Sequence, residues 1–208
     1  MSAIPNSNLP GHNQLHGRVI GALDLCQESQ DIDFKESCNW GNLKLQITRT
    51  SMAMANLRDG GVIIIGVSER DGEWQLQGIQ DAHLETYDED EANDFVNRYA
   101  SPSLRLELVL VEHRDRKFLA VKVPEFERLP VICKRNGENI RKLKEGSIYI
   151  RQPGKPQTTQ ANRAEDISQL IELAAEKRAK EIISVSRRIG MVPIESDREA
   201  FDDELDGL

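Results

Sequence analysis

The sequence is short of cysteine and of long apolar runs. Among its 208 residues there are three cysteines, Cys26, Cys38 and Cys133. They lie far apart, with no CxxC pair and no histidine pair nearby, which argues against a structural zinc site and favours reduced, buried thiols. No stretch approaches the roughly 20 apolar residues that cross a bilayer, and residues 1–12 lack the apolar core of a signal peptide. We therefore expect a soluble, cytoplasmic protein with no membrane partner.

Charge is unevenly distributed along the chain. The formal net charge is −8, and residues 191–208 contain seven acidic side chains against Arg198 alone, so this tail carries −6 of it. The remaining body is close to neutral, and its composition is that of a globular protein. We expect a disordered acidic tail, which either keeps the protein in solution or screens a basic surface.

Apolar periodicity predicts helices and short strands in alternation. Helices are expected at 13–25, at 43–57, after the acidic stretch at 83–91 and through residue 99, and from Thr158 or Thr159 to about residue 190. Strands are expected at 31–35, 62–67, 74–79, 104–112, 117–123, 131–134 and 147–151. The unbroken apolar run at 62–67 is typical of a central strand buried on both faces.

Turn residues arrange these strands into a sheet. The turns at 70–73 and 114–116 predict two antiparallel hairpins, the first of them between the strands at 62–67 and 74–79. The fold class is therefore α/β (α+β): a mixed, largely antiparallel sheet with flanking helices and a long C-terminal helix. We expect a flexible leader at 1–12, a core domain at 13–165, a helical extension at 166–190 and the acidic tail at 191–208.

Five short motifs occur in a distinctive order. They are E-S-Q-D-I-D-F-K at 28–35, A-N at 55–56, G-G-V-I-I-I-G-V at 60–67, G-I at 78–79 and Y-I-R at 149–151. In order and spacing they resemble the Schlafen core domain, also called the divergent AlbA-like domain, in which a glutamate is usual where this chain has Asp33. The resemblance covers about residues 26–170 and implies an AlbA-like α/β fold.

The resemblance also implies a catalytic site. In nuclease members of the family three carboxylates are catalytic, and the matching positions here are Glu28, Asp33 and Glu69. Converging carboxylates are the ligands that Mg²⁺ or Mn²⁺ prefers, and such an ion can activate water or a ribose hydroxyl. Lys35, on the same strand face as Asp33, could offset phosphate charge. Without the resemblance, the acids would be interpreted as ordinary surface residues.

Basic residues form a run from the strand predicted at 131–134 to just beyond the strand predicted at 147–151. We expect them to contact nucleic-acid phosphates, the alternative being a solvated hairpin edge. They are Lys134, Arg135, Arg141, Lys142, Lys144, Arg151 and Lys155. Aromatic residues make up only 5% of the chain, which favours recognition of structured RNA through its backbone and shape over base stacking.

Two functions remain open from the sequence. The first is a metal-dependent endoribonuclease acting on tRNA-like RNA, and the second is a non-catalytic nucleic-acid-binding or regulatory module of the same fold. Family relatives are often labelled ATP-binding, but Gly60-Gly61 precedes a strand rather than a helix, so we interpret the pair as a turn and not a phosphate cradle. The long C-terminal helix predicts a homodimer.

Overall fold

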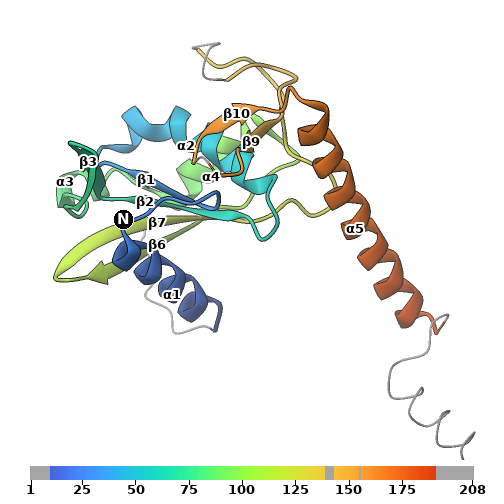
Figure 1. The fold of residues 1–208 in the computed structure, drawn as a ribbon, viewed down its shortest axis with the longest axis horizontal. Coiled ribbons are helices and arrows are strands. Elements are labelled where there is room, and N and C mark those ends of the chain that lie inside the picture. Colours follow the sequence, from blue (N-terminus) through green and yellow to red (C-terminus); the bar gives the residue numbers. More distant parts are fainter. Residues whose placement is uncertain (1–9, 139–142, 155, 191–208) are drawn as a thin grey trace, which may run out of the picture.

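The computed structural model describes residues 10–138, 143–154 and 156–190 (Figure 1). Its helices are α1 (Pro10–Leu25), α2 (Trp40–Ala55), α3 (Asp81–Leu84), α4 (Glu89–Asn97) and α5 (Ala164–Arg188). Its strands are β1 (Ile32–Lys35), β2 (Gly61–Ile65), β3 (Val67–Arg70), β4 (Glu73–Leu76), β5 (Ala100–Ser101), β6 (Glu107–His113), β7 (Arg116–Val123), β8 (Ile132–Cys133), β9 (Tyr149–Arg151) and β10 (Thr158–Gln160).

The central sheet has the strand order β1-β2-β7-β6. β1 runs parallel to β2, because α2 carries the chain from the end of one to the start of the other, and the other neighbours are antiparallel. The β6–β7 hairpin turns through Arg114 and Asp115, both with positive φ, as the predicted turn requires. The mixed, largely antiparallel fold with flanking helices is confirmed.

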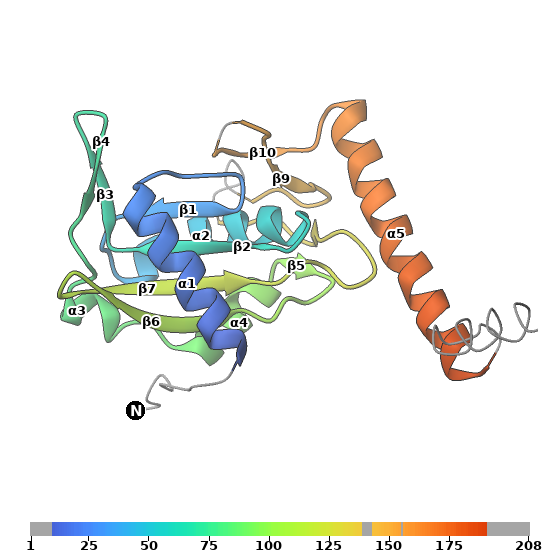
Figure 2. The ribbon, with the colours of Figure 1, turned by 60° about the horizontal axis from the view of Figure 1, so that its bottom comes forward.

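Two apolar clusters cover the two faces of this sheet. Ile32, Phe34, Val62 and Ile64 pack with α1 on one face, whereas alternate residues such as Ile63 pack with α2 and α4 on the other. Figure 2 shows α1 crossing in front of the strands and α2 behind them. The predicted central strand is therefore confirmed as buried on both faces, and the alternation in β1 turns Asp33 and Lys35 toward α2.

The predicted first hairpin is wrong in one respect. The apolar run does not form one strand, because Gly66 adopts a φ of +118° and a Cβ there would lie 2.7 Å from the Gly78 carbonyl carbon. β2 ends before this glycine, and β3 leaves the central sheet to pair with β4 in a separate ribbon. Only glycine permits the chain to bend here with two backbone segments in contact.

Several predicted boundaries also differ from the structure. α1 begins at Pro10 within the expected leader, where proline suits the first turn of a helix. The helix expected after the acidic stretch at 83–91 begins within that stretch, as α4 at Glu89, and the short α3 precedes it. Thr158 and Thr159 do not cap the last helix but belong to β10, which pairs with β9, and α5 starts after Arg163. The predicted acidic tail lies outside the described residues.

The last helix stands apart from the sheet (Figures 1 and 2). Only three of its residues are buried, Asp166, Leu170 and Leu173. Ion pairs add to this attachment, with Lys177 Nζ 2.9 Å from Glu125 Oε2 and Arg58 Nη1 2.9 Å from Glu176 Oε1. In the described ranges no helix is long and apolar enough to span a bilayer.

Candidate functional site

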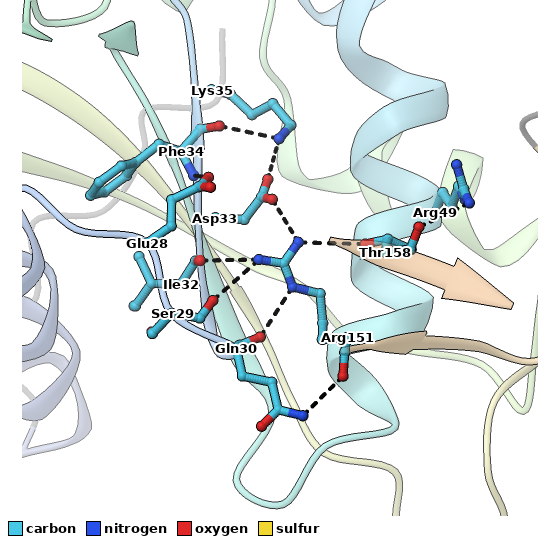
Figure 3. Close-up of polar contacts among 10 residues, drawn as sticks. All are labelled: Glu28, Ser29, Gln30, Ile32, Asp33, Phe34, Lys35, Arg49, Arg151 and Thr158. Carbon is cyan, nitrogen blue, oxygen red and sulfur yellow. Dashed lines mark hydrogen bonds and ion pairs between the residues drawn. The ribbon is translucent and has the colours of Figure 1, made fainter. Parts of the chain in front are cut away.

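The first and last of the five motifs meet in space around Arg151 (Figure 3). This residue is 2% exposed, and each of its five side-chain N–H donors has an acceptor. Nε donates to the Gln30 carbonyl, Nη1 to Asp33 Oδ1 at 2.8 Å and toward Thr158 Oγ1, and Nη2 to the carbonyls of Ser29 and Ile32. Arg151 therefore holds β9 against β1 and the turn before it.

Arg151 cannot serve as a phosphate contact, and that prediction is wrong. Its donors are all used within the protein, and its charge is balanced by the buried carboxylate of Asp33. A periodicity argument could not detect this, because it places Arg151 on a strand without saying which residue lies opposite. Arg151 of the Y-I-R motif at 149–151 therefore has a structural role in this fold.

The predicted carboxylates occupy three different environments. Asp33 is 4% exposed and accepts from both Arg151 and Lys35. Glu28 is half-buried, and its Oε1 accepts the Phe34 backbone N–H at 2.7 Å. Glu69 is exposed on β3, opposite Trp74 in the ribbon that has left the central sheet.

These carboxylates do not fit the predicted metal site. Within the described ranges, no group of three or more His, Cys, Asp or Glu side chains is placed to hold a metal ion. Asp33 already has two cationic partners, Arg151 and Lys35, and both would repel a divalent cation at that carboxylate. The bend at Gly66 directs Glu69 into a separate ribbon, which spacing in the sequence could not indicate.

Glu28 has an unusual protonation equilibrium. Burial raises its pKa above the ordinary value of 4.5, and the nearby Asp33 adds to the rise. The Phe34 N–H, Lys35 and Arg151 act in the opposite direction without cancelling it. Glu28 therefore retains a proton to higher pH than an exposed glutamate, which is a property of groups that exchange protons in catalysis.

A pocket of about 410 Å³ lies beside this cluster, between β1, α2 and the segment before β10. Two cations at its wall have donors to spare. Lys35 Nζ donates to Asp33 and to the Phe34 carbonyl, which leaves one of its three hydrogens free among the described contacts. Arg49 donates through Nη2 to the Thr158 carbonyl, and among the described contacts its Nη1 has no acceptor; its Nε is buried and also without an acceptor there.

The charge of this pocket is positive. Its lining holds three cations, Lys35, Arg49 and Arg151, and the carboxylate of Asp33 is shared between Lys35 and Arg151, so positive charge is in excess at the wall. Arg49 is also fixed in place, with its guanidinium carbon 5.2 Å from the Tyr149 ring centroid. Sequence reasoning missed Arg49, because a single arginine on an Ala- and Met-rich helix carries no signal until β9 is seen to pack against α2.

The predicted basic run lies only in part within the described residues. Lys134, Arg135 and Lys144 are exposed, as a phosphate-contacting surface requires, whereas Arg141, Lys142 and Lys155 lie outside the described ranges. The Lys144 backbone N–H donates to the Tyr149 hydroxyl at 2.8 Å, so Lys144 and Arg49 contact the same tyrosine. The Lys144 backbone and the Arg49 guanidinium therefore contact different parts of one side chain, although Lys144 does not itself line the pocket.

A second group of cations was not apparent in the sequence. Lys44 and Arg98 lie over the Phe95 ring, and Arg135 lies over the Tyr99 ring at 5.0 Å. The two rings are 5.5 Å apart, so three cations from separate segments gather on α2, α4 and the segment after β8. This group adds positive charge to the α2 side of the molecule.

Comparison with known proteins identifies the family. The profile of the family described as Schlafen, AlbA_2 matches residues 28–160, more than half of the chain. The protein belongs to the Schlafen, AlbA_2 family. Its suspected membership from the five motifs is thereby confirmed.

Individual relatives of this Schlafen, AlbA_2 protein are distant. It is 26% identical over 138 residues to an uncharacterized ATP-binding protein of Ureaplasma parvum serovar 3, covering 60% of this chain and 38% of the relative. A crystal structure of the DIP2311 protein from Corynebacterium diphtheriae gives a TM-score of 0.51 at 16% identity, covering 77% and 29% of the two chains. This protein therefore spans less than half of either relative.

A further solved structure is similar at a lower level. It is the N-terminal domain of a putative ATP-dependent DNA helicase RecG-related protein from Nitrosomonas europaea, with a TM-score of 0.43 and 18% identity, covering 72% of this chain and 92% of that one.

The first glycine of the G-G motif at 60–61 has a steric role in this fold, since a Cβ on Gly60 would lie 2.1 Å from the Val123 carbonyl oxygen.

Proposed function

We propose that this protein is a nucleic-acid-binding module that grips the phosphate backbone at the pocket between β1 and α2. The observation that carries the proposal is the pair Lys35 and Arg49, which line one pocket with donors to spare beside an already neutralised Asp33. Phosphate oxygens are the acceptors that such a pair suits. The exposed Lys134, Arg135 and Lys144 extend the same contact.

Structured RNA is the substrate class that this arrangement favours. The pocket wall offers cations and amides rather than exposed aromatic rings, and Trp40 and Tyr149 are both buried. Backbone recognition of a tRNA-like shape needs charges at fixed spacing and no stacking platform. DNA is the alternative ligand, and the 2′-hydroxyl is what distinguishes the two.

Equilibrium binding to tRNA and to duplex DNA, followed by fluorescence anisotropy, tests the proposal. Arg49→Gln removes a charge from the pocket and is expected to weaken RNA binding by roughly tenfold. Arg105→Gln is the matched control, because this exposed arginine precedes β6 at the opposite edge of the sheet. Equal affinities for the wild type and Arg49→Gln would contradict the proposal.

A metal-dependent endoribonuclease is the second candidate. The observation in its favour is Glu28, a half-buried carboxyl with a raised pKa that interacts with Asp33 and Lys35. Mg²⁺ or Mn²⁺ is the ion to be tested, although Asp33 would have to be available to it. The residues proposed for this activity are Glu28, Asp33, Glu69 and Lys35.

Incubation of purified tRNA with either ion distinguishes the two candidates. Discrete products from the wild type that disappear in Glu28→Gln would establish cleavage, and Glu69→Gln reports whether the third carboxylate takes part. Retained binding with no cleavage at any metal concentration would leave the non-catalytic module.

A further inference from the structure

The face of α5 that points away from the domain carries a regular apolar stripe. Ile171, Ile182 and Val185 of α5, and Ile189 at its C-cap, are 63%, 53%, 44% and 61% exposed. Together with Ala175 and Arg178 they follow one another at intervals of four, three, four, three and four residues. This is the heptad spacing of a coiled-coil seam.

The stripe does not overlap the contact of α5 with its own domain. Leu170, Leu173 and Lys177 face the domain, and the helical period of 3.6 residues turns the stripe about a third of a turn away from them. Both surfaces can therefore be used at once. An exposed apolar seam of this length is a candidate for a partner helix.

The charges of α5 are divided between its two halves. Residues 164–176 contain four acidic side chains and no basic one, whereas residues 177–188 contain five basic side chains and one acidic. A second copy laid antiparallel would bring each acidic half against a basic half, and a parallel copy would bring like charges together. Asp166, Glu176 and Glu181 are already paired within their own chain, and the remaining difference in charge between the two halves favours an antiparallel second copy over a parallel one.

The stripe is also symmetric about Lys180. Folding the helix back on itself at this residue matches Ile171 with Ile189 and Ala175 with Val185. The inner positions then match as well, Arg178 with Ile182. If the heptad positions are lettered a to g, residues 175, 182 and 189 occupy a positions and residues 171, 178 and 185 occupy d positions. Each matched pair therefore joins an a position to a d position, as in an antiparallel two-stranded coiled coil. Arg178 is the single charged seam residue, and a polar residue at such a position fixes the register.

We propose that two copies of this protein associate through α5 as an antiparallel, two-fold symmetric coiled coil centred on Lys180. The arrangement leaves both pockets free, because the α5 seam and the pocket between β1 and α2 share no residues. Association through α5 does not require nucleic acid to be bound. It presents two binding sites in one particle, which raises avidity for long RNA.

Light scattering and sedimentation of the full chain at tens of micromolar test the association. The wild type is expected at twice the monomer mass. Ile182→Glu places a charge in the seam and is expected to weaken association by at least about tenfold. Ile183→Glu is the matched control, because this neighbour is exposed off the seam and its substitution should leave the dimer intact.

Monomeric wild type, or an unchanged dimer for Ile182→Glu, would overturn the proposal. Circular dichroism of both variants keeps the comparison valid, since both substitutions fall at exposed positions and should preserve helix content.

Cysteine cross-linking tests the direction of the two helices. In a background with Cys26→Ser and Cys38→Ser, chains carrying Ile171→Cys are mixed with chains carrying Ile189→Cys and oxidised. An antiparallel pair cross-links only in the mixture, because the two 171 positions lie about 27 Å apart along the axis. Cross-linking of Ile171→Cys with itself would show a parallel pair and overturn the proposal.

Discussion

Arg151 and Asp33 form the buried ion pair at the centre of the domain. Their side chains are 1% and 5% exposed and 2.8 Å apart. A buried ion pair is tolerated only where its geometry is good and further hydrogen bonds satisfy the remaining donors and acceptors. Here three backbone carbonyls accept hydrogen bonds from the remaining N–H groups of the guanidinium. The intact pair contributes little net free energy of folding, whereas removal of one partner leaves the other as an unpaired buried charge and strongly destabilises the fold.

Removal of the Asp33 charge is expected to destabilise the fold strongly. Asp33→Asn retains the size of the side chain but leaves Arg151 charged, buried and short of its counter-ion. We expect the free energy of unfolding to fall by about 3 kcal/mol. Urea denaturation measures it, with the exposed Glu69→Gln as a control expected within about 0.5 kcal/mol of the wild type. Equal losses in the two variants would contradict this account.

Glu28 makes stability depend on pH in a definite direction. Its folded-state pKa is raised, so between 4.5 and that higher pKa the folded protein binds more protons than the unfolded chain. Stability contributed by the protonated form is therefore present at low pH and is lost as pH rises through the folded-state pKa. Glu28→Gln can still accept the Phe34 N–H but cannot ionise.

The variant Glu28→Gln should accordingly gain stability relative to the wild type as pH increases from 4 to 7. Urea unfolding of both proteins at the two pH values measures the difference. A wild type whose stability follows that of the variant at every pH would show that Glu28 titrates as an exposed glutamate does.

At the scale of elements, the link between α2 and β2 depends on Gly60. This residue has a φ of +65°, and an added Cβ would lie 2.1 Å from the Val123 carbonyl oxygen on β7. Gly72, in the β3–β4 turn, has a φ of +81° but nothing within 4 Å of its Cβ position. The two glycines therefore share a left-handed backbone and differ in the space around them.

This pair separates steric conflict from backbone strain. Gly72→Ala introduces strain alone and should lower the unfolding free energy by about 1 kcal/mol. Gly60→Ala adds a clash with backbone that cannot move aside, so we expect a loss of at least about 3 kcal/mol. Thermal unfolding of both variants measures the two losses of unfolding free energy. Equal losses would mean that the β7 backbone moves aside to accommodate the new methyl group.

Periodicity predicted the elements whose environment repeats along the chain. The continuous burial of β2, the alternation in β1 and the β6–β7 hairpin all follow from side-chain spacing. The end of β2 at Gly66 did not, because the cause is the approach of Gly78 from a distant segment. β10 was missed for a similar reason, since Thr158–Gln160 become a strand only by pairing with β9.

The site was predictable to the extent that its motifs are local. Spacing placed Asp33 and Lys35 on one face of β1, and the resemblance added Glu28. The partner that determines the chemistry of Asp33 is Arg151, 118 positions later in the chain. Sequence proximity could not reveal that this arginine neutralises the proposed metal ligand.

For the molecule as a whole, the acidic net charge hides a cationic site. Most of the −8 belongs to residues 191–208, and Lys35 and Arg49 keep the pocket positive. The two pocket contacts alone should lower RNA affinity by roughly tenfold as monovalent salt rises from about 50 to 200 mM, and contacts from Lys134, Arg135 and Lys144 would steepen the fall. Anisotropy titrations across this range measure the slope. Lys35→Met should reduce the slope of log affinity against log salt concentration by about one, the share of a single phosphate contact. An unaltered slope would show that Lys35 does not contact a phosphate.

The clamp at Arg151 also has a consequence for biosynthesis. Its acceptors on Ser29, Gln30 and Ile32 leave the ribosome early, whereas Arg151 is added 118 positions after Asp33, a delay of roughly 6 to 24 s at ordinary rates of translation. During that interval Asp33 can pair only with Lys35, and the carbonyls of Ser29, Gln30 and Ile32 lack the guanidinium that they bind in the folded domain. We expect chains released before Arg151 to aggregate or be degraded, because the domain cannot complete its fold until this arginine has been synthesised.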